Sequence, residues 1–268
     1  MSRSVLKFLM VLAATALFTT MAAADSFTFN IAGTIPSSGK YVTSVVTITS
    51  VGTSSSDSNR GFDINVVNTT ANPSSLTQIL DAIQFNLKSG VSLGTLTLKS
   101  TGTSAILRDV ASNGTYVDMA STGLGQTESN GQIDWGLVSG SAFKLCAGAY
   151  NTSSCPMQQE GIIGSPDTNG AYSAAGTPIT GSSGSPELYG TLGQPVTFHV
   201  YASGVTANTM IANVIDSANF YYGTCGGSDK VQVAVVPTGG GSVPEPASIF
   251  LLGSGIAGLA TKLRKRKR

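Results

Sequence analysis

Short segments in which apolar and polar residues alternate constrain the fold of this chain more than any other feature. The longest runs from Tyr41 to Val51 and is rich in Val, Ile and Thr, which favour strands. Alternation with a period of two places successive side chains on opposite faces of a strand, so each segment can bury one face. The pattern predicts strands at residues 27–31, 41–51, 62–67, 93–99, 105–110, 133–138, 196–202 and 231–236.

Turn signals separate these segments. Asn113-Gly114, Asn130-Gly131 and Asn169-Gly170 supply the positive φ angles that tight turns between strands require. The best helix candidate, residues 74–81, is short and leads directly into the strand-like residues 83–87. Residues 161–184 are poor in apolar side chains, which indicates a long excursion over the surface.

Strands therefore outnumber helices, without a regular strand–helix alternation. An antiparallel β-sandwich is the natural way to bury such half-apolar segments, so we predict an all-β fold. We assign this domain to residues 25–236 and a Gly-rich spacer to residues 237–242. No repeat of fixed period points to a solenoid or propeller.

The first 24 residues have the three parts of a secretory signal peptide. Arg3 and Lys7 give a basic start, an apolar stretch follows, and Ala22 and Ala24 fit an A-x-A cleavage site before Asp25. We expect signal peptidase to remove residues 1–24. An uncleaved anchor helix is the alternative, although the apolar run is short for spanning a bilayer.

Charge is distributed unevenly along the chain. The formal net charge is +1, but residues 262–268 hold six Lys or Arg, whereas residues 25–242 hold 7 basic and 13 acidic residues, or 7 − 13 = −6. A domain with this charge and no basic stripe is a poor candidate for binding nucleic acid.

The C-terminus combines three elements. Pro244 and Pro246 hold Glu245 in an extended backbone that cannot join a helix. Residues 247–261 then form an apolar run that is about 22 Å long as a helix, slightly short of a bilayer's hydrocarbon core. The basic cluster at residues 262–268 resists translocation, so this segment is predicted to be a single membrane helix with the domain on the opposite side.

This tail resembles the PEP-CTERM sorting signal, because the Pro-Glu-Pro at 244–246, the Gly-rich helix and the terminal basic cluster occur in that order. The resemblance covers residues 243–268 and implies an exosortase substrate in a Gram-negative bacterium that makes exopolysaccharide. It implies that Val243, Pro244, Glu245 and Pro246 form the recognition segment. A plain C-terminal anchor with an incidental Pro-Glu-Pro is the alternative.

Three cysteines, Cys146, Cys155 and Cys225, lie in the part predicted to be exported. An oxidising compartment favours disulfides, and we expect a bridge between Cys146 and Cys155 that leaves Cys225 unpaired. No metal site is expected, because the chain has no Cys-x-x-Cys and its one His is far away in sequence.

Catalytic signals are weak. Alternation places His199 beside Thr197 and Tyr201, which indicates a solvent-facing strand residue, and no Gly-x-Ser-x-Gly elbow accompanies it. Asp57, Asn59, Gly61 and Asp63 have the two-residue spacing of a calcium loop but lack its terminal Glu, so a turn entering a strand is favoured.

The Gly-rich sequence Gly253-Ser-Gly255-Ile-Ala-Gly258 matches a dinucleotide fingerprint, but too few residues follow it for a strand–helix–strand unit. We expect no cofactor.

The leading hypothesis is a non-enzymatic, exosortase-sorted protein. It would pass through the inner membrane to the cell surface or extracellular matrix, in association with exopolysaccharide or biofilm. The alternative is a carbohydrate-binding module that stacks Trp135, Tyr189 or Tyr201 on sugars. A glycoside hydrolase needs only two carboxylates and stays open as a third hypothesis.

Overall fold

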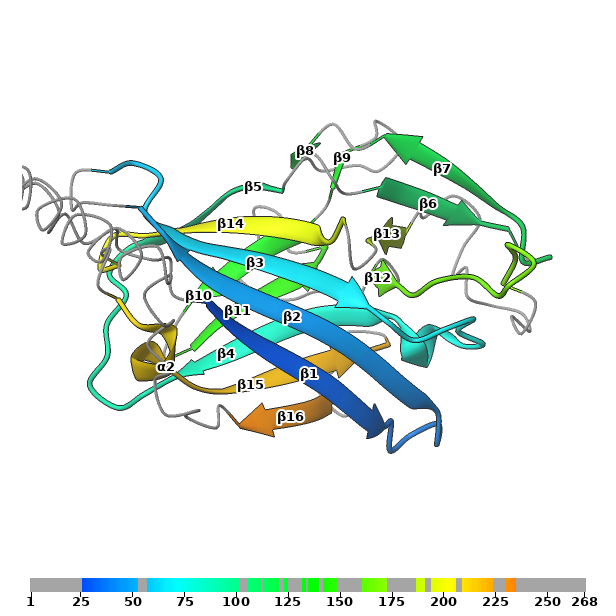
Figure 1. Ribbon diagram of the computed structural model, residues 1–268, viewed down its shortest axis with the longest axis horizontal. Helices are drawn as coiled ribbons and strands as arrows, with labels where there is room; N and C mark the ends of the chain where they lie inside the picture. The colour runs from blue at the N-terminus through cyan, green and yellow to red at the C-terminus, as the bar shows by residue number, and fades with distance from the viewer. Residues whose placement is uncertain are drawn as a thin grey trace, which may run out of the picture. The chain divides into compact units, whose positions relative to one another are not determined.

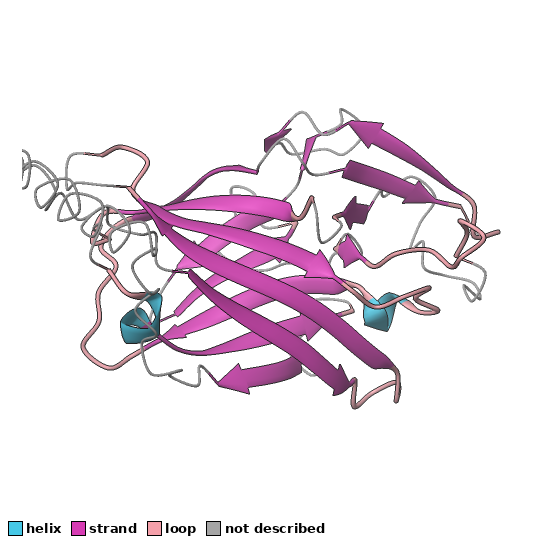
Figure 2. Cartoon of the chain, in the orientation of Figure 1, coloured by secondary structure: helices cyan, strands magenta, loops and turns pink. Residues whose placement is uncertain are grey.

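A computed structural model describes residues 26–52, 57–101, 106–111, 113–120, 123–124, 132–133, 135–139, 142–148, 161–172, 187–190, 194–205, 209–223 and 230–234. All of them belong to the first of two compact units, residues 1–235, and the second unit comprises residues 236–268. Strands dominate the described residues, with two short helical segments, α2 (Ile211–Val214) and the 3-10 helix η1 (Leu76–Gln78) (Figure 2).

The first sheet has five strands in the order β1-β2-β3-β14-β5, and every pairing in it is antiparallel. We call it the five-stranded sheet. Its strands are β1 (Ser26–Thr34), β2 (Tyr41–Val51), β3 (Gly61–Asn68), β14 (Val196–Ala202) and β5 (Leu96–Thr101). Buried residues alternate with partly exposed ones along β2 and β14, as their sequences predict.

The second sheet has nine strands, and β4 (Leu80–Leu87) is its central member. We call it the nine-stranded sheet. On one side β4 pairs with β15, which in turn pairs with β16. On the other side β4 pairs with β11, which in turn pairs with β10. The first residue of β4 also pairs with β12, which leads on to β13, β6 and β7. These strands are β15 (Ile215–Tyr222), β16 (Lys230–Ala234), β11 (Ala142–Ala147), β10 (Trp135–Ser139), β12 (Ile162–Ile163), β13 (Glu187–Tyr189), β6 (Ile106–Val110) and β7 (Tyr116–Ala120).

Antiparallel pairing therefore prevails, as predicted. Two short exceptions are parallel, the pair β12–β13 and a separate pair of β8 (Gly123–Leu124) with β9 (Gln132–Ile133).

Aromatic rings join the two sheets. Phe29 of β1 lies 5.8 Å from Phe220 of β15, measured between ring centroids. Phe62 of β3 stacks on Phe143 of β11 at 6.2 Å. These residues belong to one apolar core, to which both sheets contribute buried side chains. Both sheets therefore bury their inner faces against each other.

A hydrogen bond also crosses this core. The hydroxyl of Tyr222 on β15 donates to Ser44 Oγ on β2 at 2.8 Å, and both residues are buried. Burial raises the pKa of Tyr222, although the hydrogen bond to Ser44 acts to lower it. Tyr222 is thus held as the neutral phenol between the sheets.

Strands β12, β13, β6 and β7 form an extension at one end of the facing sheets (Figure 1). It has a small apolar cluster of its own, whose buried members are Ile79, Val110, Ile163 and Tyr172. Asn68, at the end of β3, connects it to the five-stranded sheet, because its amide donates at 2.8 Å to the carbonyls of Gln78 and Ile162.

The close approach of β3 to β14 requires a glycine. Gly61 has φ +153°, and a Cβ there would lie 1.9 Å from the carbonyl oxygen of Val200. Any side chain would therefore push the first residue of β3 away from β14.

Each predicted strand has a counterpart in the described residues. The limits of β2 and β14 match the prediction, whereas β5 begins three residues later than expected. The Asn113-Gly114 and Asn169-Gly170 turns are also present, with positive φ at both glycines. Asn130-Gly131 lies outside the described residues.

Two predictions are wrong. The expected helix at 74–81 is only the single turn η1, because Leu80 and Asp81 already belong to β4. The expected surface excursion at 161–184 begins instead with buried structure, since Gly161, Ile163 and Tyr172 are covered.

The predicted membrane helix lies in residues 247–261, outside the described part of the chain. Within that part, no helix has both the length and the apolar character needed to cross a membrane.

We predict that the free energy of unfolding of Tyr222→Phe decreases less steeply with rising pH, above about pH 10, than that of the wild type. Because the pKa of Tyr222 is raised in the folded protein, ionisation of the unfolded state lowers stability once the pH exceeds about 10. One such tyrosine can contribute up to about 1.4 kcal/mol per pH unit. Urea unfolding of the exported protein at a series of pH values from 9 to 11.5 measures the effect, and identical slopes for variant and wild type would contradict it.

Candidate functional site

Arg108 lies at the centre of a polar network in the described residues. It belongs to β6, and its side chain is only 4% exposed. The Asn113-Gly114 turn joins β6 to β7 and sets their register, which places Arg108 opposite Asp118. The hairpin therefore delivers a carboxylate to a buried guanidinium.

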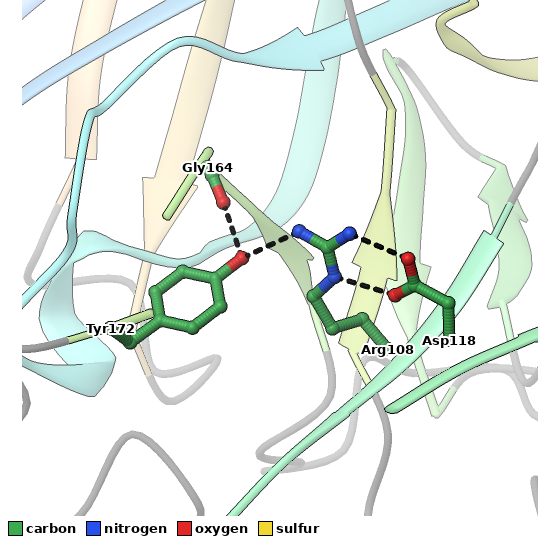
Figure 3. A network of polar contacts seen from close by, with 4 residues as sticks. All are labelled: Arg108, Asp118, Gly164 and Tyr172. Carbon is green, nitrogen blue, oxygen red and sulfur yellow. Dashed lines mark hydrogen bonds and ion pairs between the residues drawn. The ribbon is translucent and has the colours of Figure 1, made fainter. Parts of the chain in front are cut away.

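The guanidinium is held by hydrogen bonds on two sides (Figure 3). Its Nε and Nη2 donate to the two carboxylate oxygens of Asp118 at 2.6 and 2.7 Å. Its Nη1 donates to the hydroxyl of Tyr172 at 3.1 Å, and that hydroxyl donates to the carbonyl of Gly164 at 2.8 Å. These two parallel hydrogen bonds fix the orientation of the guanidinium and neutralise its charge with that of the carboxylate.

Two tyrosine rings complete this enclosure. The Cζ of Arg108 lies 3.8 Å from the ring centroid of Tyr116 on β7 and 3.7 Å from that of Tyr189 on β13. Both distances are well within the range of a cation–π contact, which is stronger when the cation is shielded from water. We call Arg108, Asp118, Tyr116, Tyr172 and Tyr189 the Arg108 cluster.

The electrostatics of the cluster favour a permanent charge on Arg108. Burial acts to lower its pKa, but hydrogen bonds to Asp118 and Tyr172 outweigh burial and the pKa is raised. For Tyr172, by contrast, burial raises the pKa, and the hydrogen bond from Arg108 and its positive charge only partly offset this effect. The cluster therefore contains a fixed cation and a neutral phenol, an arrangement suited to holding β6, β7, β13 and the Tyr172 segment together.

A second polar group lies on the outer face of the five-stranded sheet. Nδ1 of His199 lies 2.6 Å from Oδ1 of Asp63 on the neighbouring strand. His199 faces outward beside Thr197 and Tyr201, as predicted, but its side chain is only 16% exposed, so it is less accessible than expected. The pair links β3 to β14.

The calcium-like segment forms a turn. The carboxylate of Asp57 accepts a hydrogen bond from the backbone N–H of Asn59 at 2.8 Å, and the chain enters β3 at Gly61. Asp63 contacts His199 instead of facing the turn. The described residues contain no group of three His, Cys, Asp or Glu side chains placed to hold a metal ion.

The three aromatic candidates for sugar stacking differ in their surroundings. Trp135 is 2% exposed and packs against Phe198, so it belongs to the core and cannot stack on a sugar. Tyr189 covers Arg108. Tyr201 is half-buried on the outer face, with Lys99 5.2 Å and Arg60 5.8 Å from its ring centroid.

Several predicted site residues lie outside the described part of the chain. They are Ala22 and Ala24 at the expected signal cleavage site, Cys155, and the sorting residues Val243, Pro244, Glu245 and Pro246. Cys146 is fully buried in β11. Its bridge to Cys155 stays a prediction.

The C-terminal segment matches a family model. A model described as the PEP-CTERM protein-sorting motif matches residues 242–267. The chain carries an exosortase sorting signal. The match shifts the predicted limits, 243–268, by one residue at each end. A PEP-CTERM motif implies processing by an exosortase and export of the protein for sorting to the cell surface. No curated protein and no solved structure matches the chain.

The sequence analysis missed the Arg108 cluster, although a signal for it was present. Arg108 and Asp118 lie five residues to either side of Asn113 in the predicted Asn113-Gly114 turn. A hairpin around that turn makes the two residues a cross-strand pair of opposite charge.

We predict that Asp118→Asn destabilises the exported protein, because it removes the anionic partner of a buried cation. Since Asp118 is 38% exposed, solvent screens part of the pair, and we expect a loss of about 1–2 kcal/mol. Asp109→Asn, on the neighbouring strand β6, is the matched control and should change stability by less than about 0.5 kcal/mol. Urea unfolding measures the free energy of unfolding of both variants. Equal losses would contradict a specific stabilising role for the Arg108–Asp118 pair.

Proposed function

We propose that this protein is a non-enzymatic cell-surface or extracellular-matrix protein of a Gram-negative bacterium, associated with exopolysaccharide or biofilm. The observation that carries the proposal is the PEP-CTERM match at residues 242–267. In this account, signal peptidase cleaves after Ala24, and the C-terminal helix then holds an inner-membrane intermediate within reach of the exosortase.

The order of the tail supports this route. Pro244 and Pro246 keep Glu245 extended and available for recognition, next to the apolar run at residues 247–261. The basic residues at 262–268 stop translocation. The Gly-rich spacer at 237–242 allows the β-sandwich to stand away from the membrane while the tail is processed.

The polar contacts of the described residues support a non-enzymatic role. The carboxylate of Asp118 binds Arg108, that of Asp63 lies against His199, and that of Asp57 caps a turn. Each contact stabilises a strand pair or a loop. A glycoside hydrolase, the least favoured hypothesis, would need two carboxyl groups facing each other across a sugar-sized gap.

A carbohydrate-binding module is the alternative, and Tyr201 is the observation that favours it. Its ring lies on the outer face of the five-stranded sheet, with the positive charges of Arg60 and Lys99 5.8 and 5.2 Å from its centroid. An aromatic ring beside cations suits an acidic sugar, because the ring can stack on the pyranose while the cations attract its carboxylate.

For this alternative we predict that Tyr201→Ala weakens binding to purified acidic exopolysaccharide about tenfold, the loss expected for one stacking contact. Tyr41→Ala is the matched control, since Tyr41 begins β2, is 59% exposed and lies away from the two cations. Co-sedimentation with the polysaccharide measures binding. Unchanged binding by Tyr201→Ala would rule out stacking at this position.

For the sorting route we predict that processing depends on the motif and on the enzyme. Replacing Pro244, Glu245 and Pro246 with Ala should leave the anchor intact and give an unprocessed, membrane-retained form. Deleting residues 262–268 should instead remove the stop to translocation and release unsorted protein. Immunoblots of membrane, surface and medium fractions, with intact masses, should be compared in hosts with and without an exosortase.

The two hosts also supply the control. Wild-type protein should lose mass at its C-terminus only in the host that has the exosortase. If its mass is the same in both hosts and the triple Ala variant behaves like wild type, the tail acts only as an anchor.

A further inference from the structure

β1 is an edge strand without the usual protection against pairing with another chain. It pairs with β2 over all nine residues from Ser26 to Thr34 in one uninterrupted register. Its sequence, Ser-Phe-Thr-Phe-Asn-Ile-Ala-Gly-Thr, contains no charged residue and no proline. Charges, prolines and bulges are the devices that natural proteins use to block such edges.

Other edges of the two sheets have such devices or are shorter. β5, at the opposite edge of the five-stranded sheet, contains Lys99, and its pairing with β14 shifts register at His199. β16 begins with an exposed Lys230. β7 contains the exposed Asp118, and β10 has only five residues. Among the described edge strands, β1 is therefore the one that is long, regularly paired and free of charged residues.

The free side of β1 presents both backbone and apolar groups. Among the described residues, its backbone hydrogen bonds go to β2 alone. In an antiparallel edge strand, alternate N–H and C=O groups then point away from the sheet. Phe27 is only partly buried and packs edge-on against Phe29, with 4.8 Å between ring centroids. A further strand would pair the backbone groups and cover this ring.

We propose that a second copy of this chain occupies the edge, with the two β1 strands pairing antiparallel across a two-fold axis. Self-pairing of an edge strand brings each side chain near its own copy or near a close neighbour, so a charge in the strand would repel itself. β1 has no such charge. The five-stranded sheets of two copies thereby become one continuous sheet.

The register follows from pairing all nine residues. Asn30 is the middle residue of β1, so it lies opposite Asn30 of the other copy, where two amides can exchange hydrogen bonds. Phe29 then lies opposite Ile31, both on the inward face. Both cores thus continue across the junction. This association is independent of tail processing, although sorting to one surface would concentrate the copies.

The test is sedimentation velocity of the exported, purified protein over a range of concentrations. Wild type should form dimers, whereas Asn30→Lys and Asn30→Glu should each self-associate at least about tenfold more weakly. An equimolar mixture of the two variants should dimerise again, because opposite charges then face each other. Asn30 is exposed, so the fold should tolerate either substitution, and a thermal melt checks this.

Thr47→Lys is the matched control. Thr47 lies on the same outer face but on the interior strand β2, and its hydroxyl is 2.9 Å from that of Thr28 on β1. The Thr47→Lys substitution adds the same charge as Asn30→Lys but does not place it on the edge strand, so the dimer should remain. Monomeric wild type, equal disruption by Thr47→Lys, or no recovery in the mixture would each overturn the proposal.

Cross-linking provides a test that does not depend on charge. Asn30→Cys should form a disulfide between copies under mild oxidation, whereas Ser26→Cys should not, because two Ser26 positions would lie about 27 Å apart in this register. Wild type under the same oxidant controls for the native cysteines. Equal cross-linking of the two variants would overturn the register, and cross-linking of neither would overturn the pairing.

Discussion

The contact between the inner faces of the two sheets is the interaction on which the other features depend. Phe29 packs on Phe220, Phe62 on Phe143, and Trp135 on Phe198, and each pair joins a strand of one sheet to a strand of the other. Burial of such rings is the main favourable term in folding a chain with few charged groups. Because 11% of the residues are charged, ion pairs can contribute little by number. The Tyr222–Ser44 hydrogen bond adds a directional link within the same core.

The polar interactions fix the parts that the core does not reach. The Arg108 cluster closes the extension of β6, β7, β12 and β13, which has only a small apolar cluster of its own. Asp63 and His199 connect two strands on the outer face of the five-stranded sheet. Among the described residues, the Arg108–Asp118 and His199–Asp63 pairs are thus engaged in structural contacts, while the tail carries the sorting signal. Structural contacts in the folded domain and a sorting signal in the tail are consistent with the proposed role at the cell surface.

The regular strands could be predicted because alternation and burial agree along them. Tyr41–Val51 and Val196–Ala202 match in both limits. The segment at 74–81 misled because Leu76, Ile79 and Leu80 have helical spacing, yet these residues pack in two different clusters. Residues 161–172 are mostly small or polar, yet residues 161–164 and Tyr172 are buried through contacts with distant segments, such as Gly164 against Thr70. The Arg108 cluster depends on Tyr172 and Tyr189, whose approach is set by tertiary packing, although the Arg108–Asp118 pair follows from the hairpin.

Native-state hydrogen exchange of the exported protein tests the central claim, that one core shared by two sheets sustains the fold. Backbone amides of β2, β3 and β14 should open with the same free energy as those of β4, β11 and β15, because neither sheet can keep its inner face buried without the other. Phe62→Ala should lower the opening free energy of both sets equally. A five-stranded sheet that opens separately, or a Phe62→Ala effect confined to its own sheet, would contradict the account.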